Sequence, residues 1–527
     1  MEHRLASFNY SAILTWLIAL PLVGSAIVAL LPASRVKLIR NTAIAAMAGM
    51  VVLAAVAVRL FNWAPSAGGH FQLMQIWPWI PALHAAYFVG VDALSLYLIL
   101  FTAALGLLTA VGSYGVGHQL RAYYISIMLL TGFMIGALAA ENIFLFALFF
   151  ILSIFPMYFI TGLWGGERRQ SAALKFGLLA LVSSGLLFAA IFLAPHANQM
   201  HEVAAKRTGL SHWVMSHDLA IVAAGRLSTA QWFLWLILIA LGLRIGIPGL
   251  HIWLPDFCCE NTGASAMLVL GGNFLLAAYC VERLGGPLLH LQSAHIRVCI
   301  AWVVGIGVIL IALSGLAQND LGRLIASWIS LQAGLITLGV LAFTSGSLEG
   351  AMLQSVGAVI TLASLLWVCH VLQLRARHRD LSRLGGISQL MPGLFGLSLP
   401  GFIAAMAVPG FCLFAGEFLV TRSVFGLHPG KGSSLGFSSF AHWQAVLGVT
   451  VILGLFLMIA TLLWTIERVF FGSPRPEYSH FQKLSRMERL VLVPLVAFNL
   501  ALGLFPMWLI IDPLTSTIRT LAHIGAN

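Results

Sequence analysis

Charged residues are scarce in this chain of 527 residues: Asp, Glu, Lys and Arg together make up 9% of it, whereas 60% of the residues are hydrophobic. Soluble domains carry roughly a quarter charged residues, so the composition excludes a soluble protein. It also excludes intrinsic disorder, because so apolar a chain cannot remain solvated. Many runs reach the about 20 apolar residues that a membrane-spanning helix needs. The composition therefore predicts an all-α polytopic membrane protein.

Acidic residues are the rarer of the two charge types, with 17 Asp+Glu against 28 Lys+Arg and a net charge of +11. In a soluble protein such an excess would suggest nucleic acid. Here the basic residues lie in short segments between apolar runs, where they determine topology and contact anionic lipid. We therefore expect the lipid bilayer, and no nucleic acid, as the surroundings of the chain.

Sequence motifs for bound cofactors are missing. The chain has no Walker loop, no GxGxxG after a strand and no HExxH, and no soluble region that could hold NADH, a flavin or an iron–sulfur cluster. We expect no catalytic, cofactor-binding or metal-binding residue, so any redox chemistry belongs to partner subunits. The six cysteines form no CxxC and are typical of small core residues. The adjacent Cys258 and Cys259 leave a metal or redox role open as an alternative.

Apolar runs of suitable length predict 14 transmembrane helices. They lie at about residues 11–31, 42–60, 89–112, 122–140, 143–163, 173–194, 230–250, 264–284, 298–317, 323–343, 348–372, 393–424, 441–471 and 489–511. The first run is longer than a secretory signal allows and predicts an uncleaved span. The run at 393–424 contains Pro400 and Pro409 and predicts a broken helix.

Domain organisation is predicted to be simple, with residues 1–527 as one transmembrane domain. Its core covers about residues 120–425, preceded by helices within 1–115 and followed by helices within 440–511. The longest polar segment, residues 195–229, is predicted to be an interfacial loop. A metal site formed by its irregularly spaced histidines is the weaker alternative. Those histidines are His196, His201, His212 and His217. Most Lys and Arg residues fall on one side, which predicts an inner-membrane protein with both termini outside.

Ionisable residues at membrane depth are costly and mark ion pathways. Glu417 and Arg244 lie inside apolar runs, and Lys175 lies near the start of one. The structural alternative for each is an interhelical ion pair or a side chain that reaches the interface. We favour a functional role for Glu417 and an interfacial position for Lys175. For Arg244 both interpretations stay open, since Arg remains protonated and cannot pass on a proton.

Two apolar runs share a Pro-Gly interruption, at residues 247–250 and 408–411. Paired interruptions of this kind are typical of inverted repeats around a transport pathway. They predict that the seventh and twelfth helices are broken.

Six sequence motifs resemble the complex I subunit 4 family, which is chain M of the bacterial proton-translocating NADH–quinone oxidoreductase and is related to Mrp-type antiporter subunits. The motifs are Gly90-Val91-Asp92-Ala93-Leu94-Ser95-Leu96, Pro156-Met157-Tyr158-Phe159 with Gly162-Leu163-Trp164-Gly165-Gly166-Glu167-Arg168-Arg169, Ala173-Leu174-Lys175-Phe176, His251-Ile252-Trp253-Leu254-Pro255-Asp256, Asp380-Leu381-Ser382-Arg383-Leu384-Gly385-Gly386 and Gly416-Glu417-Phe418. The resemblance runs from about residue 88 to 420. It implies 14 helices with two inverted five-helix repeats and a midplane chain of ionisable side chains and water.

Of the ionisable positions that the resemblance implies, this chain retains Lys175, His251, Glu260 and Glu417. With Arg244, which stands where the family has a lysine, these are the proton-pathway candidates. At the other positions the family's glutamate, lysine and histidines are replaced. The replacements are Ile151, Leu275, Cys258, Gln332 and Ala358.

The replacements remove proton-bearing groups from an apolar midplane, which leaves desolvation barriers that only water could bridge. Arg244 loses its glutamate partner and must pair elsewhere, or face water or lipid headgroups. The first functional interpretation is a membrane-arm subunit of a complex I-like oxidoreductase, next to other membrane-arm subunits, with a degenerate proton channel through Glu417 and Lys175. The alternatives are a non-conducting scaffold in a hydrogenase or inorganic-carbon uptake complex, and a Mrp-like cation/proton antiporter subunit.

Overall fold

The computed structural model describes residues 12–63, 71–80, 85–193, 227–261, 263–290, 294–425, 440–478, 481–506, 511–515 and 518. The four histidines of the polar segment at 195–229 lie outside the described residues, so that prediction stays open. The chain forms two compact units. The first unit is Met1–Arg244, Arg283–Leu291 and Asp512–Asn527, and the second unit is Ile245–Glu282 and Gln292–Ile511.

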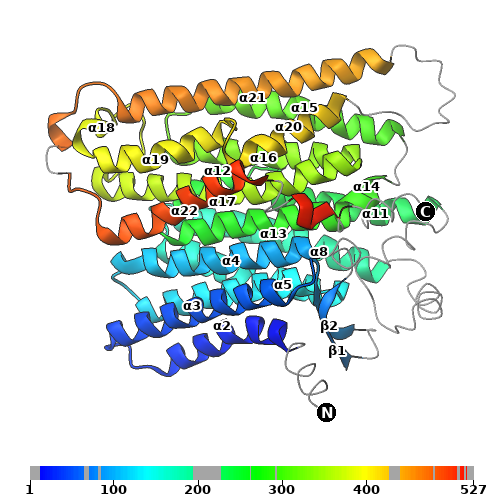
Figure 1. The fold of residues 1–527 in the computed structure, drawn as a ribbon, viewed down its shortest axis with the longest axis horizontal. Helices are drawn as coiled ribbons and strands as arrows, with labels where there is room; N and C mark the ends of the chain where they lie inside the picture. Colours follow the sequence, from blue (N-terminus) through cyan, green and yellow to red (C-terminus); the bar gives the residue numbers. More distant parts are fainter. Residues whose placement is uncertain are drawn as a thin grey trace. The chain divides into compact units, whose positions relative to one another are not determined.

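The first unit is built mainly from helices. They are α2 (Ile13–Leu30), α3 (Val36–Leu60), α4 (Ala93–Gly112), η2 (Ser113–Gly115), α5 (Leu120–Ala139), α6 (Ile143–Leu152), α7 (Ile154–Trp164), α8 (Arg169–Leu193), α11 (Leu227–Ile245) and α14 (Gly286–His290). Helix α2 packs against α3 and α5, and α4 packs against the same two helices (Figure 1). Helix α4 begins at a capping box, in which Asp92 and Ser95 satisfy each other's backbone N–H groups.

Helix α3 begins at Val36, earlier than the expected residue 42, so Lys37 and Arg40 belong to the helix and not to a loop. The Arg40 guanidinium donates a hydrogen bond to the Tyr114 carbonyl oxygen over 3.1 Å and lies 3.8 Å from the centre of the Tyr114 ring. These contacts stabilise the basic Arg40 side chain inside the helix. Hydropathy alone instead places a helix boundary at such a basic residue.

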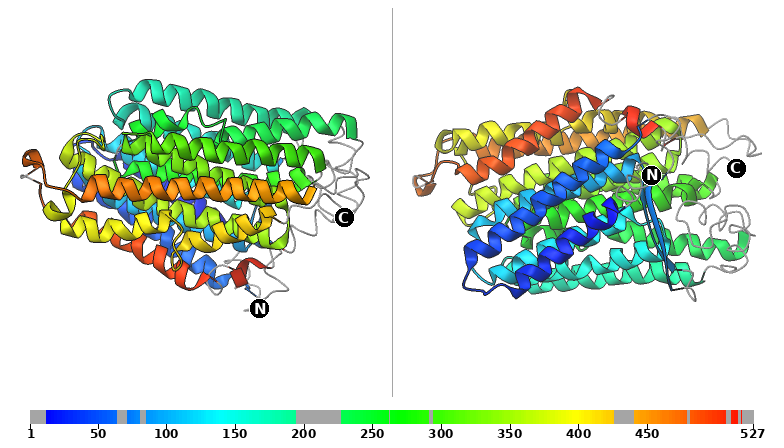
Figure 2. Two further views of the ribbon diagram at one scale, coloured as in Figure 1. Left: turned by 90° about the horizontal axis from the view of Figure 1, so that it is seen from above. Right: turned by 60° about the horizontal axis from the view of Figure 1, so that its bottom comes forward.

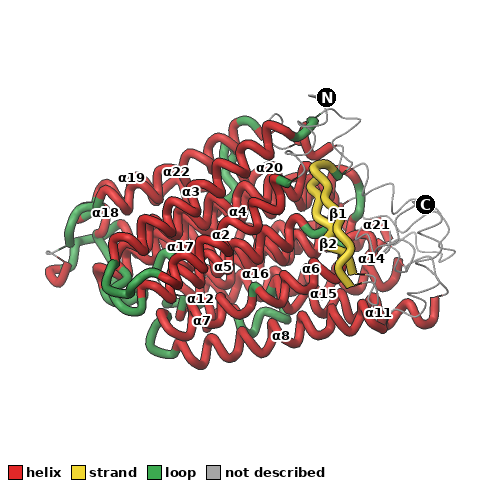
Figure 3. Tube along the Cα trace, turned by 90° about the horizontal axis from the view of Figure 1, so that it is seen from below, coloured by secondary structure: helices red, strands yellow, loops and turns green. Residues whose placement is uncertain are grey.

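A two-stranded antiparallel hairpin adds to the helices of the first unit. Strand β1 (Gln72–Ile80) pairs with β2 (Ala85–Val91), and Trp77 opposes Tyr87 with their rings 5.4 Å apart (Figure 3). Aromatic cross-strand pairs stabilise such hairpins. The sequence analysis predicted no strand here.

The regular elements of the second unit, among the described residues, are helices joined by loops. Its elements are α12 (Leu254–Glu260), η3 (Met267–Gly271), α13 (Gly272–Cys280), α15 (Ala294–Leu316), α16 (Leu321–Ala342), α17 (Ser345–Ala376), α18 (Ile387–Leu390), α19 (Pro392–Ala405), α20 (Cys412–Phe425), α21 (Phe440–Phe470), η5 (Pro476–Tyr478) and α22 (Arg486–Leu504). The π-helical turn η4 (Val281–Gly285) continues α13. Helix α17 is buried along almost its whole length, because α16, α19, α20 and α22 all pack against it. Helix α21 lies along α15 and α20 (Figure 2).

Twelve helices among the described residues are long and apolar enough to cross a membrane. This confirms the prediction of a largely helical polytopic membrane protein, whereas the count of 14 is not confirmed. The expected runs at 230–250 and 393–424 instead contain the shorter apolar helices Trp235–Ile245 and Pro392–Ala405.

The break in the run at 393–424 is confirmed. Helix α19 ends at Ala405 and α20 begins at Cys412. Between them, Ala407 has a φ of 51° and Gly410 a φ of +96°, in the left-handed region, and Pro409 has no N–H to continue a helix. The run at 230–250 is also interrupted, because α11 ends at Ile245 and the next helix begins at Leu254.

Candidate functional site

The predicted pathway residue Glu417 lies in a cluster of three buried polar side chains in the second unit. Gln332 of α16 donates a hydrogen bond from Nε2 to Glu417 Oε1 over 3.0 Å, and Gln354 of α17 donates to the same oxygen over 3.4 Å. Gln354 also donates to Gln332 Oε1. We call Glu417, Gln332 and Gln354 the carboxyl–amide cluster.

The carboxyl–amide cluster holds its carboxyl group without a positive charge. Glu417 is 8% exposed, and among the described residues no Lys, Arg or His forms an ion pair with it. Amide N–H groups can donate to the carboxylate, but they do not carry protons themselves. Glu417 is therefore the one group of the cluster that can take up and release a proton, while the amides compensate part of its desolvation.

Glu417 was predicted from the sequence, but its partners were not. Gln332 was noted only as a position where the family has a histidine, whereas in the structure its side chain donates a hydrogen bond to Glu417. Gln354 was not identified, although an amide in the middle of an apolar run was the available signal. Its Oε1 has no hydrogen-bond partner among the described residues, so the cluster retains an open acceptor.

Gly416 allows α20 to approach α17 closely at the carboxyl–amide cluster. A Cβ at this position would lie 2.6 Å from Gln354 Oε1 and 2.7 Å from the Gln354 backbone nitrogen. We therefore expect Gly416→Ala to force the helices apart and to lower the stability of the purified chain by about 1–3 kcal/mol.

Thermal unfolding in detergent would measure this loss. Gly393→Ala is the matched control, because a Cβ at Gly393 would meet nothing within 4 Å. Equal melting temperatures for the two variants would show that close packing at Gly416 does not hold the cluster together.

A second buried carboxyl group, Glu282, was missed. It lies on η4, is 1% exposed, and accepts a hydrogen bond at Oε1 from the hydroxyl group of Ser355 on α17. Its other oxygen, Oε2, has no hydrogen-bond partner among the described residues. Glu282 stands near the end of the expected run at 264–284, where an acid is easily taken for an interfacial residue. In the structure the helix continues past it to His290.

Arg244 lies in the last turn of α11 and is 1% exposed. It donates a hydrogen bond to Ser153 Oγ over 3.0 Å, and its guanidinium lies 4.6 Å from the centre of the Phe150 ring and 5.6 Å from that of Phe176. Of the expected alternatives for Arg244, these contacts agree with pairing elsewhere. A hydroxyl group and two aromatic faces surround the cation, and cation–π contacts are strong where water is excluded.

Three other predicted pathway residues do not belong to the carboxyl–amide cluster, and each is described in its own unit. Lys175 is exposed on α8 of the first unit. In the second unit, His251 is half-buried and accepts a hydrogen bond at Nδ1 from the Gly249 N–H over 3.3 Å. Glu260 is buried at the end of α12. The role of Lys175, His251 and Glu260 in a proton pathway stays a prediction.

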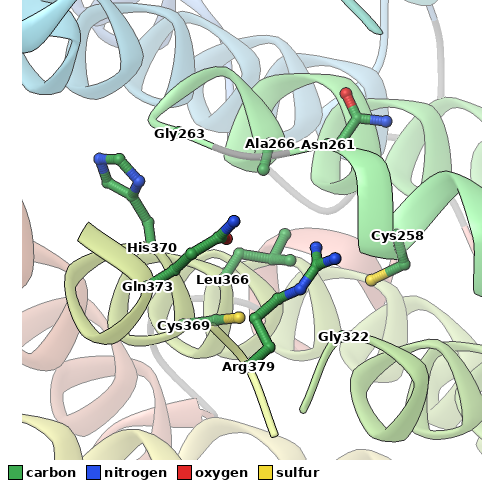
Figure 4. A pocket seen from close by; sticks show the side chains of 10 residues that line it. All are labelled: Cys258, Asn261, Gly263, Ala266, Gly322, Leu366, Cys369, His370, Gln373 and Arg379. Carbon is green, nitrogen blue, oxygen red and sulfur yellow. The ribbon is translucent and has the colours of Figure 1, made fainter. Parts of the chain in front are cut away.

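A small pocket lies where α12 meets α17 in the second unit (Figure 4). Cys258, Cys369 and Arg379 are among its lining residues. Cys259 donates its thiol hydrogen to Asp320 Oδ1 over 3.3 Å, and all six cysteines are free. Within the described ranges, no group of three or more His, Cys, Asp or Glu side chains could hold a metal ion.

The loop after α17 carries the Asp380-Leu381-Ser382-Arg383 motif and is locally ordered. Asp380 accepts hydrogen bonds at Oδ1 from the Ser382 hydroxyl over 2.7 Å and from its N–H over 2.9 Å, and these bonds lower the pKa of the Asp380 carboxyl. Arg379 lies 3.7 Å from Asp320 at the start of α16. Leu381 of the motif donates its N–H to the Asn319 carbonyl oxygen over 2.8 Å, so the motif and Arg379 together join the loop after α17 to the start of α16.

An ion cluster in the first unit involves Arg283. Its Nη1 lies 2.5 Å from Asp92 Oδ2, and its Nη2 lies 3.8 Å from Glu141 Oε1. All three side chains are buried. Because Asp92 also caps α4, the cluster links the first motif of the sequence to Arg283.

Comparison with known proteins agrees with this architecture. The family described as "NADH:quinone oxidoreductase/Mrp antiporter, TM" matches residues 140–443, more than half of the chain. The NADH-quinone oxidoreductase subunit M of Rickettsia typhi is 26% identical over 438 residues, or 83% of each chain. The NAD(P)H-quinone oxidoreductase chain 4-3 of a Nostoc species is 28% identical over 462 residues, or 87% of this chain and 78% of the relative.

Two solved structures share the fold. A chain of the respiratory complex I from Thermus thermophilus has a TM-score of 0.80 at 21% identity and covers 98% of this chain and 100% of its own length. The Mrp complex from a Dietzia species has a TM-score of 0.77 at 17% identity, covering 96% of this chain and 52% of the Dietzia chain.

Proposed function

This chain belongs to the NADH:quinone oxidoreductase/Mrp antiporter transmembrane family, and from that membership we propose that it is a membrane-arm subunit of a complex I-like NADH–quinone oxidoreductase. In this role it takes part in proton translocation coupled to electron transport. The observation that carries the proposal is Glu417, a buried carboxyl group next to the break between α19 and α20, with two amides as hydrogen-bond donors. Such a group can hold a proton inside the membrane.

The chemistry assigned to this chain is proton movement. Glu417 binds and releases the proton, and Gln332 and Gln354 orient its carboxyl group. Oxidation of NADH and reduction of quinone belong to partner subunits, and we propose no redox cofactor on this chain. Lys175, His251 and Glu260 remain candidate stations, and Arg244 shapes the electrostatic potential without passing on a proton.

The location follows from the same proposal. The chain lies in the inner (cytoplasmic) membrane with both termini outside, next to other membrane-arm subunits. Residues 1–527 then act as one transmembrane domain, with a transporter-like core at about residues 120–425. The distribution of Lys and Arg along the sequence supports this orientation.

A non-conducting scaffold is the second candidate function. Leu275 and Ala358 are buried, and Ile151 is half-buried, at positions where the family resemblance implies ionisable groups. An apolar residue cannot carry a proton, so these positions favour a subunit that couples or holds other subunits together in a hydrogenase or carbon-uptake complex. A Mrp-like antiporter subunit would need the same missing groups and is less well supported.

Co-purification tests the proposal. We expect a tagged chain from gently solubilised membranes to bring down NADH-oxidising and quinone-site subunits, identified by mass spectrometry. Untagged membranes serve as the control. A different soluble partner without those subunits would contradict the respiratory assignment and support the scaffold.

A further inference from the structure

Glu282 occupies an unusual position in its helix. It lies on the π-helical turn η4, which directly follows α13. Single π-helical turns inside α-helices are frequent at functional sites, because they redirect side chains at the expense of regular hydrogen bonding. Glu282 on this turn is 1% exposed, and it lies within the apolar candidate membrane span Met267–Gly285.

The position compensates for a missing group. Leu275, which stands where the family resemblance implies a lysine, is buried seven residues earlier on the same helical stretch. The regular α-helix that contains Leu275 ends at Cys280, and Glu282 lies on the π-helical turn that follows it. An ionisable side chain is therefore absent at Leu275, and a carboxyl group is present seven residues further along the chain.

Helix α17 connects Glu282 with the carboxyl–amide cluster. Ser355 donates to Glu282, and its neighbour Gln354 donates to Glu417 over 3.4 Å. Consecutive Cα atoms are about 3.8 Å apart. Two buried carboxyl groups, brought in by η4 and α20, are thus held by adjacent residues of one helix.

The Ser355 hydroxyl has a second acceptor, which gives the site two protonation states. Ser355 Oγ also lies 2.9 Å from the Ala351 carbonyl oxygen. With Glu282 ionised, the hydroxyl donates to the carboxylate. With Glu282 protonated, the hydroxyl donates to Ala351 and accepts the new O–H of the acid. Among the described residues no cation forms an ion pair with Glu282, so nothing locks the ionised state.

On the basis of the proposed function, we propose that Glu282 is a proton-binding station of this chain, held by Ser355, which takes the place of the one missing at Leu275. The step is a simple transfer. A hydronium ion delivers a proton to a carboxylate oxygen of Glu282, an O–H bond forms and water is left. The reverse step returns the proton to water.

Infrared spectroscopy and transport assays test this proposal with Glu282→Gln, which keeps the side-chain shape and removes the acid. We expect the variant, in the assembled complex in proteoliposomes, to pump protons at least about tenfold more slowly, a barrier increase of about 1.4 kcal/mol. We also expect the purified chain to lose the carbonyl stretch of one protonated carboxylic acid. Glu477→Gln, at an exposed carboxyl of η5, is the matched control and should change neither signal.

The outcomes separate this proposal from the proposed function. Wild-type complex that pumps no protons contradicts the proposed function, while the infrared band of the purified chain still reports on Glu282. A Glu282→Gln variant that retains both pumping and the band overturns the station. If that variant does not assemble, Glu282→Asp keeps an acid in an altered position, and an unshifted band would then overturn the proposal.

Discussion

Glu417→Gln is expected to slow coupled proton movement of the assembled complex at least about tenfold, with little change in the amount of assembled chain. Glutamine has the same shape and keeps an oxygen that can accept the hydrogen bond from Gln332, so the packing of α20 is preserved. It cannot take up a proton. The loss would therefore come from the missing acid and not from a disturbed fold.

Proton uptake by proteoliposomes during NADH oxidation would measure this effect, with electron transfer recorded in the same sample. Glu477→Gln is again a suitable control, because this residue of η5 is exposed. Unchanged pumping in Glu417→Gln would remove the carboxyl–amide cluster from the pathway and favour the scaffold function.

Arg283→Met is expected to cost the most stability, about 3–5 kcal/mol, because it leaves the buried carboxylates of Asp92 and Glu141 without their cation. Asp92 lies 2.5 Å and Glu141 3.8 Å from the guanidinium. The loss is a large fraction of the stability of a typical domain. Little folded chain should therefore reach the membrane.

Yield of folded chain and its thermal unfolding would measure the loss. Arg383→Met is the control. Arg383 forms an ion pair with Asp380, but its side chain is 69% exposed, so this pair should contribute less than about 1 kcal/mol to stability. Adding Asp92→Asn to Arg283→Met should recover part of the loss, since Asn removes one buried charge and still caps α4. An Arg283→Met chain as stable as wild type would show that the ion cluster contributes little.

Hydropathy and proline positions predicted most of the helical architecture. The broken helix at 393–424 was predicted from Pro400 and Pro409, but only Pro409 lies at the break, whereas Pro400 lies inside α19. The β1–β2 hairpin was not predicted, since its strands are short and their pairing depends on contacts such as Trp77 with Tyr87. The early start of α3 also depended on a contact, between Arg40 and Tyr114.

The candidate site was predicted in part. Glu417 stood out because an acid inside an apolar run is costly wherever it lies. Glu282 did not, because sequence alone places the end of a run only to within a few residues. Its significance came from the continuation of the helix to His290 and from Ser355, a residue of another helix.

The amino-acid sequence alone was enough to show that this is a membrane protein, because the free energy of transferring side chains into lipid is summed over the residues of each apolar run. It also identified Glu417 as an acidic residue that is costly to place in the membrane. Tertiary structure decided what that acid can do. The partners of Glu417 lie 85 and 63 residues away on α16 and α17, and no local pattern specifies which buried side chains meet. Only the packing of α20 against these helices does so, because a buried hydrogen bond depends on distance in space and not on separation in sequence.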